Sequence, residues 1–275
     1  MSICKLIGGS ITAILTLIFA QVFSGAVSNV ILNAGVPIAI SSMINCILYL
    51  APVFFALRLF GKKVLKLRPD ELGMPGFSIK PIWVIVAIVL PFSIKGIYLL
   101  LVKGEFVSSN MNTSQIADVV CHAVFYYGIA AGFVEEMVFR GFIFHLMEKC
   151  WNRVIAIIVP SAIFGFVHIL GTDHSLLSNI LVICAGTGVG IMFSLIVINS
   201  GSVWNSGIVH ALWNIIIIGG GLFISEKANN EAMITYVLKS KSFLITGGEF
   251  GIESSGIALA GYIVVSILIL CTGEK

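Results

Sequence analysis

Charged residues are scarce in this sequence, and their scarcity decides the class of protein. Asp, Glu, Lys and Arg make up only 11% of the 275 residues, whereas hydrophobic residues make up 58% and the mean hydropathy is +1.07. A soluble domain carries about 25% charged and about 45–50% apolar residues. Because so few charges cannot cover a water-facing surface of this length, we predict that lipid is the solvent for much of the chain.

Further absences narrow the functional classes. The formal net charge is only +3, which is too small to indicate nucleic acid as a partner. The six cysteines are scattered without a CxxC pair, so they indicate neither a disulfide framework nor a zinc knuckle. The first apolar run is longer than the core of about 7–15 residues that a signal peptide has, and a second run follows at once. We interpret this first run as a membrane helix, and a signal peptide is the less favoured alternative.

Long apolar runs are what the sequence has instead. A spanning helix needs about 20 mainly apolar residues, and about eight segments approach that length. They lie at 6–30, 38–60, 81–101, 119–146, 154–170, 176–198, 203–224 and 256–270. The sequence therefore predicts an all-α fold, a polytopic membrane bundle of about eight transmembrane helices. We expect a single domain over 1–275, with its functional motifs within 119–224.

The connections between these runs carry most of the polar residues. The basic stretch 58–80 begins with a partly amphipathic segment, which predicts an interfacial helix that ends at Pro69. Since basic loops remain in the cytoplasm, this stretch and both termini are predicted to be cytoplasmic, in a multi-pass protein of the plasma membrane. The polar stretch 225–255 then lies outside, and we expect it to be a surface loop or a short lid.

Three charges interrupt the fourth apolar segment, namely Glu135, Glu136 and Arg140. On the insertion scale each charge near a helix centre costs about 2.5–3.5 kcal/mol, so this helix needs partners in a bundle. Glu136 and Arg140 are four residues apart and can form an ion pair on one helix face, which is a structural role. Glu135 points about 100° away from Glu136. A carboxylate left unpaired in a low-dielectric pocket is suited to act as a general base.

Two other apolar segments carry histidine together with a second side chain on the same helix face. Phe164 precedes His168 by four residues, and His210 precedes Asn214 by four residues. Two such pairs beside a buried diglutamate are a rare combination. No catalytic role is assigned to the remaining histidines, His122, His145 and His174.

These residues form three ordered motifs. They read EEMVFR at 135–140, FGFVH at 164–168 and HALWN at 210–214. The ordered set EExxxR, FxxxH and HxxxN resembles the signature of the CAAX protease and bacteriocin-processing (CPBP) family. These are intramembrane glutamate endopeptidases that include the type II CAAX prenyl proteases. The motifs span less than a third of the chain, and outside them the resemblance is one of hydropathy.

The resemblance implies a role for each motif residue. Glu135 and His168 would activate a water molecule for attack on the scissile carbonyl. His210 and Asn214 would donate hydrogen bonds to the oxyanion of the tetrahedral intermediate. Support of the site is expected from Glu136, Arg140 and Phe164. The implied substrate is a peptide or a membrane-anchored protein, with a lipidated tail or a leader peptide both compatible.

Several alternatives stay open at this stage. The family is often labelled as metalloproteases, and Glu135, His168 and His210 would be the ligands if zinc is present. No cofactor is certain, and Asn214 suits an oxyanion better than zinc. A proton-coupled transporter also buries Glu and His, but we find no inverted repeat. A catalytically silent immunity or scaffold membrane protein is the other alternative.

Overall fold

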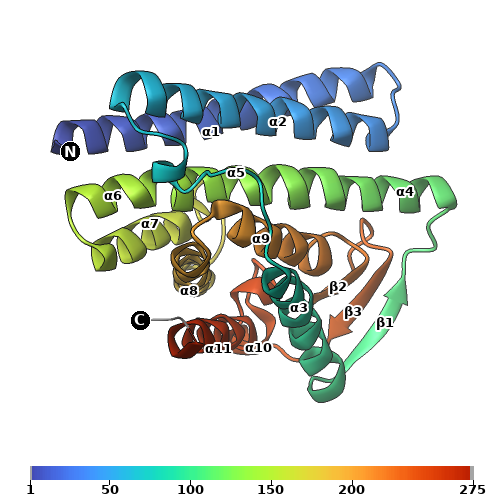
Figure 1. Cartoon of the computed structure of the whole chain (residues 1–275). Coiled ribbons are helices and arrows are strands. Elements are labelled where there is room, and N and C mark those ends of the chain that lie inside the picture. Colours follow the sequence, from blue (N-terminus) through green and yellow to red (C-terminus); the bar gives the residue numbers. More distant parts are fainter. Residues whose placement is uncertain (1, 273–275) are drawn as a thin grey trace.

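The computed structural model describes residues 2–272, and most of them lie in helices (Figure 1). Within these residues, five helical stretches are long and apolar enough to cross a membrane. They are α1 (Ile3–Asn33), α2 with its extension (Ile38–Leu65), α3 (Pro81–Leu101), a continuous stretch (Thr113–Cys150) and α8 (Leu176–Ser200). Three apolar helices are shorter, namely α7 (Arg153–Val167), α9 (Val203–Ile217) and α11 (Gly256–Thr272). The all-α membrane bundle is confirmed, and each of the eight predicted segments contains helix, but only five are long enough to span a membrane and the segment 203–224 leaves the helix at Ile217 and enters β2 at Leu222.

The stretch from Thr113 to Cys150 is the central element of the bundle. Its first turn has a capping box, in which the Asn112 side chain accepts from the Gln115 N–H and the Gln115 side chain accepts from the Asn112 N–H. The antiparallel α1 and α2 lie on one side of this stretch, and α7, α8, α9, α3 and α11 lie on the other (Figure 1). Its parts are α4 (Thr113–Cys121), η3 (His122–Gly132), α5 (Phe133–Glu136), η4 (Met137–Ile143) and α6 (Phe144–Cys150), of which η3 and η4 are π-helical.

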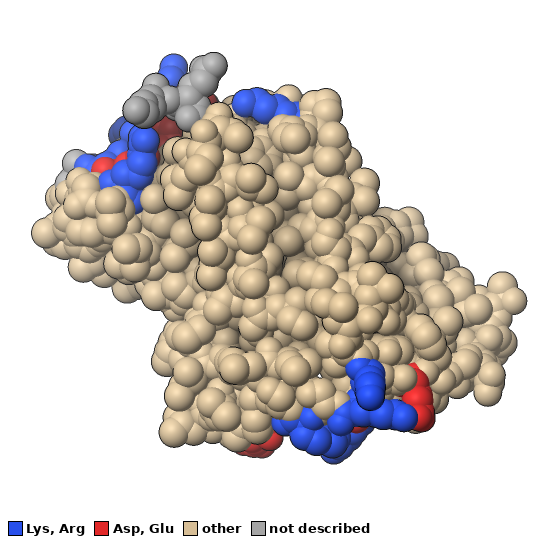
Figure 2. Space-filling model, turned by 90° about the horizontal axis from the view of Figure 1, so that it is seen from below, with Lys and Arg blue, Asp and Glu red and all other residues tan. Residues whose placement is uncertain are grey.

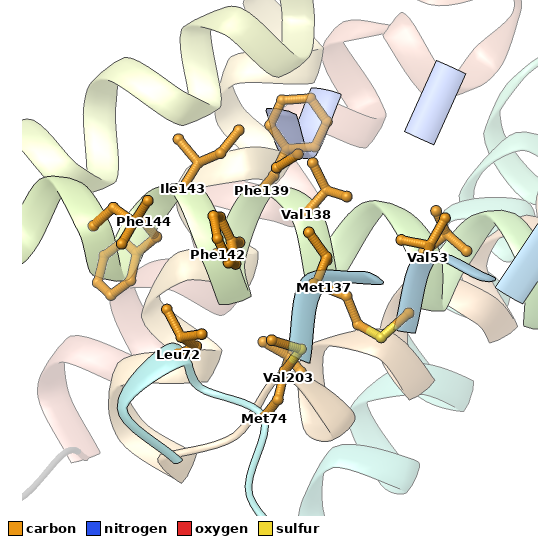
Figure 3. Close-up of a cluster of buried hydrophobic side chains, with 14 of the residues drawn as sticks. Val53, Leu72, Met74, Met137, Val138, Phe139, Phe142, Ile143, Phe144 and Val203 are labelled. Atoms are coloured by element: carbon orange, nitrogen blue, oxygen red, sulfur yellow. The ribbon is translucent and has the colours of Figure 1, made fainter. Parts of the chain in front are cut away.

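A dense apolar core surrounds the second half of the central stretch. Met137 and Phe142 are fully buried. Figure 3 shows them close to Leu72 and Met74, which come from the connection between α2 and α3, and to Val203 at the start of α9. The core therefore fixes one end of the central stretch against the loop 61–80.

The same loop differs from the prediction of a separate interfacial helix. The α2 helix continues into one π-helical turn, η1 (Gly61–Leu65), and ends at Lys66 in the left-handed region with φ 60°. A single 3-10 turn, η2 (Asp70–Leu72), follows. The predicted helix is wrong because Leu65 and Leu72 are buried in the protein, which removes the apolar face that would have lain on the membrane.

A small sheet that the sequence did not predict closes one end of the bundle (Figure 1). Its strands are β1 (Gly104–Ser108), β2 (Leu222–Ser225) and β3 (Ile234–Leu238), in the order β1-β3-β2. The β1 strand pairs antiparallel with β3, and β2 pairs parallel with β3. The stretch 225–255 is therefore more than the expected loop, because it also contains α10 (Phe243–Thr246) and η5 (Ile252–Ser254).

A buried lysine ties this sheet to the bundle. Lys95 of α3 is 6% exposed, and its ammonium donates hydrogen bonds to the carbonyl oxygens of Ile216 and Leu222. These two carbonyls lie at the end of α9 and the start of β2. Because carbonyl oxygens at a helix C-terminus carry partial negative charge, the ammonium is stabilised there and fixes the end of α9.

On the face that Figure 2 shows, charges gather at two ends of the molecule, and the surface between them is almost free of charge. One end contains the start of α1, the loop 61–80 and the turn between α6 and α7, and there Lys149 pairs with Glu71 at 3.1 Å. The other end contains the sheet, where Lys239 pairs with Glu105. We call these the basic end and the sheet end. An uncharged band of this kind is what a bilayer requires.

Candidate active site

The ion pair predicted from spacing is present in the centre of the bundle. Arg140 Nη1 donates to Glu136 Oε1 at 2.8 Å, and both side chains are 0% exposed. The guanidinium carbon lies 4.2 Å from the ring centroid of Phe164 and 5.3 Å from that of Phe193. The aromatic faces thus supply a second source of negative potential around a cation that water does not reach. Gly190 of α8 leaves the room for it, since a Cβ there would lie 2.8 Å from Arg140 Nη2.

His210 lies between the two adjacent glutamates. Its Nδ1 is 3.2 Å from Glu136 Oε1, and its Nε2 is 3.7 Å from Glu135 Oε2. The ring of Phe193 stacks on the imidazole with centroids 4.8 Å apart. An ionised carboxylate such as Glu136 has no hydrogen to donate and only accepts hydrogen bonds. The Nδ1 atom of His210 therefore carries the hydrogen of this bond, and its Nε2 atom faces Glu135. If His210 is also to donate from Nε2 to an oxyanion, its ring must carry a hydrogen on both nitrogens.

His168 directly follows α7 and has a defined tautomer. Its Nδ1 lies 2.7 Å from the carbonyl oxygen of Phe164, to which it donates. The Nε2 atom therefore has a free lone pair and is the acceptor of this ring. The Phe164 ring packs edge-on against the imidazole at 4.5 Å and also contacts the Arg140 guanidinium. Phe164 thus holds the imidazole and the ion pair in one arrangement.

Asn214 is oriented by the backbone of the central stretch. Its Nδ2 donates to the carbonyl oxygen of Tyr127 at 2.8 Å, and the residue is 8% exposed. One amide hydrogen is used in this bond, and the amide has a second. The close approach of α9 that makes the bond possible depends on Gly132, where a Cβ would lie 2.9 Å from the Ala211 nitrogen.

A cavity of about 310 Å³ joins these side chains. Glu135, His168, His210 and Asn214 all line it, so the structure brings the four predicted catalytic residues together from α5, the end of α7 and α9. Glu135 is the more accessible carboxylate of its pair, with a side chain that is 22% exposed against 0% for Glu136. The cavity is large enough for several water molecules. A carboxylate, two imidazoles and an amide donor around one cavity are suited to hydrolysis by an activated water.

One cavity residue was missed by sequence reasoning. Glu253 of η5 lines the same cavity, together with Phe250 of the preceding turn. In the sequence Glu253 is a single carboxylate in a polar stretch, which is typical of a solvated side chain. No local spacing distinguishes it, because only the folding of 243–255 over the bundle brings it to the cavity.

Glu135, His168 and His210 are the residues that would bind zinc if the protein contained it. Within residues 2–272, no three His, Cys, Asp or Glu side chains are grouped closely enough to hold a metal ion. Glu135 and His210 approach each other at 3.7 Å, but His168 is not grouped with them closely enough to complete a set of three ligands. The residues as arranged do not fit a zinc site, and we derive no step through a metal.

The unassigned histidines have structural partners. His122 Nδ1 lies 3.1 Å from Ser42 Oγ, and His145 Nδ1 lies 2.7 Å from the Gly141 carbonyl oxygen. The ring of His174 approaches Phe250 with centroids 6.2 Å apart. These three histidines do not line the cavity.

Comparison with known proteins finds one family model that is similar to part of the chain. The model of the type II CAAX prenyl endopeptidase Rce1-like family matches residues 118–216, a little over a third of the chain. No curated protein and no solved structure matches the chain. The matched region contains all three motifs and every predicted catalytic residue. It agrees with the resemblance of the motifs: residues 118–216 of this integral membrane protein are similar to the type II CAAX prenyl endopeptidase Rce1-like family.

Proposed function

We propose that this protein hydrolyses peptide bonds within the bilayer by means of a water molecule held in the cavity. The observation that carries the proposal is that Glu135, His168, His210 and Asn214 line one cavity although they come from three separate helical segments. The family match supports endopeptidase activity in general. A transporter would not need an amide donor and a second imidazole opposite a carboxylate.

The proposed chemistry assigns one task to each group. Glu135 and the Nε2 atom of His168 accept hydrogen bonds from the water and take its proton as the oxygen attacks the carbonyl carbon. Asn214, and His210 when doubly protonated, donate to the oxyanion that forms. Glu136 receives the Nδ1 hydrogen of His210 and thereby orients that ring. Arg140 balances the charge of Glu136 and takes no part in the bond changes.

The test is peptide cleavage by the protein purified in detergent, with a peptide library as substrate. Glu135→Gln keeps the size of the side chain and removes the base, so we expect kcat to fall by about 10²–10⁴-fold. Glu148→Gln is the matched control, because Glu148 lies on the same continuous helical stretch and pairs with Arg153 at the surface. Full activity of Glu135→Gln would refute the assignment. Cleavage that is lost on chelation and restored by zinc would refute the metal-free form of the mechanism.

We also propose that the basic end faces the cytoplasm. Nine lysines and arginines lie at that end, against four at the sheet end, and this asymmetry predicts the orientation of membrane proteins. At the basic end they are Lys5, Arg58, Lys62, Lys63, Lys66, Arg68, Lys80, Lys149 and Arg153. At the sheet end they are Lys103, Lys227, Lys239 and Lys241.

This orientation determines the side from which substrate arrives. His168 and Asn214 lie towards the ends of α7 and α9 that point away from the basic end, and the turn that contains Phe250 and Glu253 covers the cavity there. The cavity is thus proposed to receive peptide segments from the non-cytoplasmic side. The C-terminal end of α11 lies on the same side of the molecule as the start of α1 (Figure 1), so a green fluorescent protein fused to the carboxyl end should fluoresce, and alkaline phosphatase fused there should be inactive. The opposite result would reverse the proposed orientation.

A further inference from the structure

Glu253 is held over the cavity by contacts on both sides of it. Ile252 is 3% exposed and Ser254 is 2% exposed, so the flanking side chains anchor the short η5 turn in the protein. The Tyr262 hydroxyl donates to the Glu253 carbonyl oxygen at 3.1 Å, and Ser254 Oγ donates to the Gly247 carbonyl oxygen at 2.7 Å. The turn therefore has a fixed position, and the Glu253 side chain is directed into the cavity.

The surroundings of Glu253 favour its protonated form. Burial raises the pKa of the Glu253 carboxyl to about 7, and the negative charge of Glu135 contributes in the same direction. His210 and a hydrogen bond from the Trp213 side chain act in the opposite direction, with smaller effect. Near neutral pH a large fraction of Glu253 is therefore a carboxylic acid that can donate a hydrogen.

The titratable neighbours of Glu253 come from the elements around the cavity. Apart from Glu135 and His210, the described groups that face the cavity or act on Glu253 are His168, Tyr126, Tyr127 and Tyr262. The α8 helix also packs against η5, but its described residues at the cavity are apolar or glycine. Within the described residues, none of these four side chains forms an ion pair that would keep the Glu253 carboxyl ionised.

Peptide hydrolysis needs a proton donor for the leaving nitrogen as well as a base for the water. The leaving nitrogen of an amide cannot depart as an anion, so it must receive a proton as the C–N bond breaks. Glu135 holds the proton taken from the water and is one source of it, and Glu253 is a second carboxyl at the same cavity whose raised pKa favours the protonated form before the attack begins. The Nδ1 hydrogen of His210 is donated to Glu136, and Asn214 has no acidic hydrogen.

We infer that Glu253 donates the proton to the leaving amine in the hydrolysis proposed for this cavity. The water oxygen forms its bond to the carbonyl carbon while its proton passes to Glu135. The C–N bond then breaks, its electron pair stays on nitrogen, and nitrogen takes the hydrogen of the Glu253 carboxyl. Glu135 afterwards releases its proton to solvent and Glu253 regains one, so the net reaction consumes one water. This inference rests on the proposed function.

The test compares wild type with Glu253→Gln on a peptide from the library that wild type cleaves. We expect kcat for the peptide to fall by about 10²–10⁴-fold. The wild-type kcat should fall as pH rises through about 7, because the acid is lost, and this decline should be absent in the variant. A p-nitrophenyl ester of the same acyl segment releases a phenolate that needs no proton, so the variant should cleave the ester almost as fast as wild type.

Further variants separate a chemical role from a structural one. Glu253→Asp keeps a carboxyl group and should restore part of the peptide activity together with the decline at alkaline pH. Glu231→Gln, an exposed carboxylate at the sheet end, should behave as wild type. If Glu253→Gln keeps the peptide rate and the pH profile of wild type while Glu135→Gln is inactive, this inference is overturned and the proposed function stands. If Glu253→Gln slows the ester as much as the peptide, the residue supports the structure of the site and is not the acid. Absence of cleavage by wild type would overturn both.

Discussion

The buried pair between Glu136 and Arg140 offers the sharpest test of how the site is held together. Both side chains are fully buried, and Glu136 Oε2 together with Nε and Nη2 of Arg140 has no hydrogen-bond partner among the described residues. Removal of either charge leaves the other buried without compensation. Breaking such a pair typically costs about 3–5 kcal/mol, whereas replacing both charges by apolar residues is often neutral or stabilising.

The experiment is a double-mutant cycle with methionine at each position. Glu136→Met and Arg140→Met should each lower the unfolding midpoint in detergent by roughly 6–20 °C, at about 2–4 °C per kcal/mol. The double variant should recover most of this loss. It should nevertheless cleave peptide poorly, because His210 Nδ1 has then lost the carboxylate that orients the ring.

The matched control is the exposed pair of Arg153 and Glu148, in which Arg153 is 63% exposed. An exposed pair contributes about 0–1 kcal/mol, so Arg153→Met should melt close to wild type. The reasoning is refuted if Arg140→Met melts with wild type, or if the double variant melts no higher than the two single variants. Full activity in the double variant would show that Glu136 does not position His210.

Three further predictions concern packing, the oxyanion and pH. Gly190→Ala places a Cβ 2.8 Å from Arg140 Nη2 and should lower the free energy of unfolding by about 1–3 kcal/mol. Gly8→Ala is the control, because a Cβ there has no neighbour within 4 Å and should be tolerated. Thermal unfolding measures the stability of both variants. Asn214→Ala should lower kcat by about 10²–10³-fold in peptide cleavage, and an unchanged kcat would exclude it as an oxyanion donor. Because the pKa of Glu253 rises from 4.5 to about 7 on folding, the stability of wild type should decline as pH rises from 4.5 through about 7. Glu253→Gln should flatten that decline in melting curves measured across this range.

The helices could be predicted because the signal for them is local. Where lipid is the solvent, every buried backbone group must be bonded within its own segment, so a long apolar run nearly dictates a helix. The three strands carry no such signal. Each has only four or five residues, and β1 pairs with β3 across about 130 positions of sequence, with Glu105 opposite Val237. Their pairing depends on where α3 and α9 end.

The site shows the same division between local and distant information. Spacing by four residues was enough to predict the ion pair of Glu136 with Arg140 and the contact of Phe164 with His168. The position of His210 between two carboxylates was not predictable, since it depends on how α9 packs against Gly132 of the central stretch. Glu253 was overlooked for the same reason.

The lengths of α7 and α9 explain how a cavity with room for water can lie within the hydrocarbon core. Each has 15 residues, which at 1.5 Å per residue is about 22 Å, shorter than a hydrocarbon core of about 30 Å. Both start near the basic end, where the Val203 nitrogen donates to the Gly73 carbonyl oxygen, and the far end of each carries a cavity residue, His168 or Asn214. Non-helical backbone is tolerated at such a depth only where protein covers it or a wet cavity adjoins it. The turn with Glu253 lines the cavity together with His168 and Asn214, and β2 contacts α9, so the polar side chains at these helix ends face a cavity within the protein.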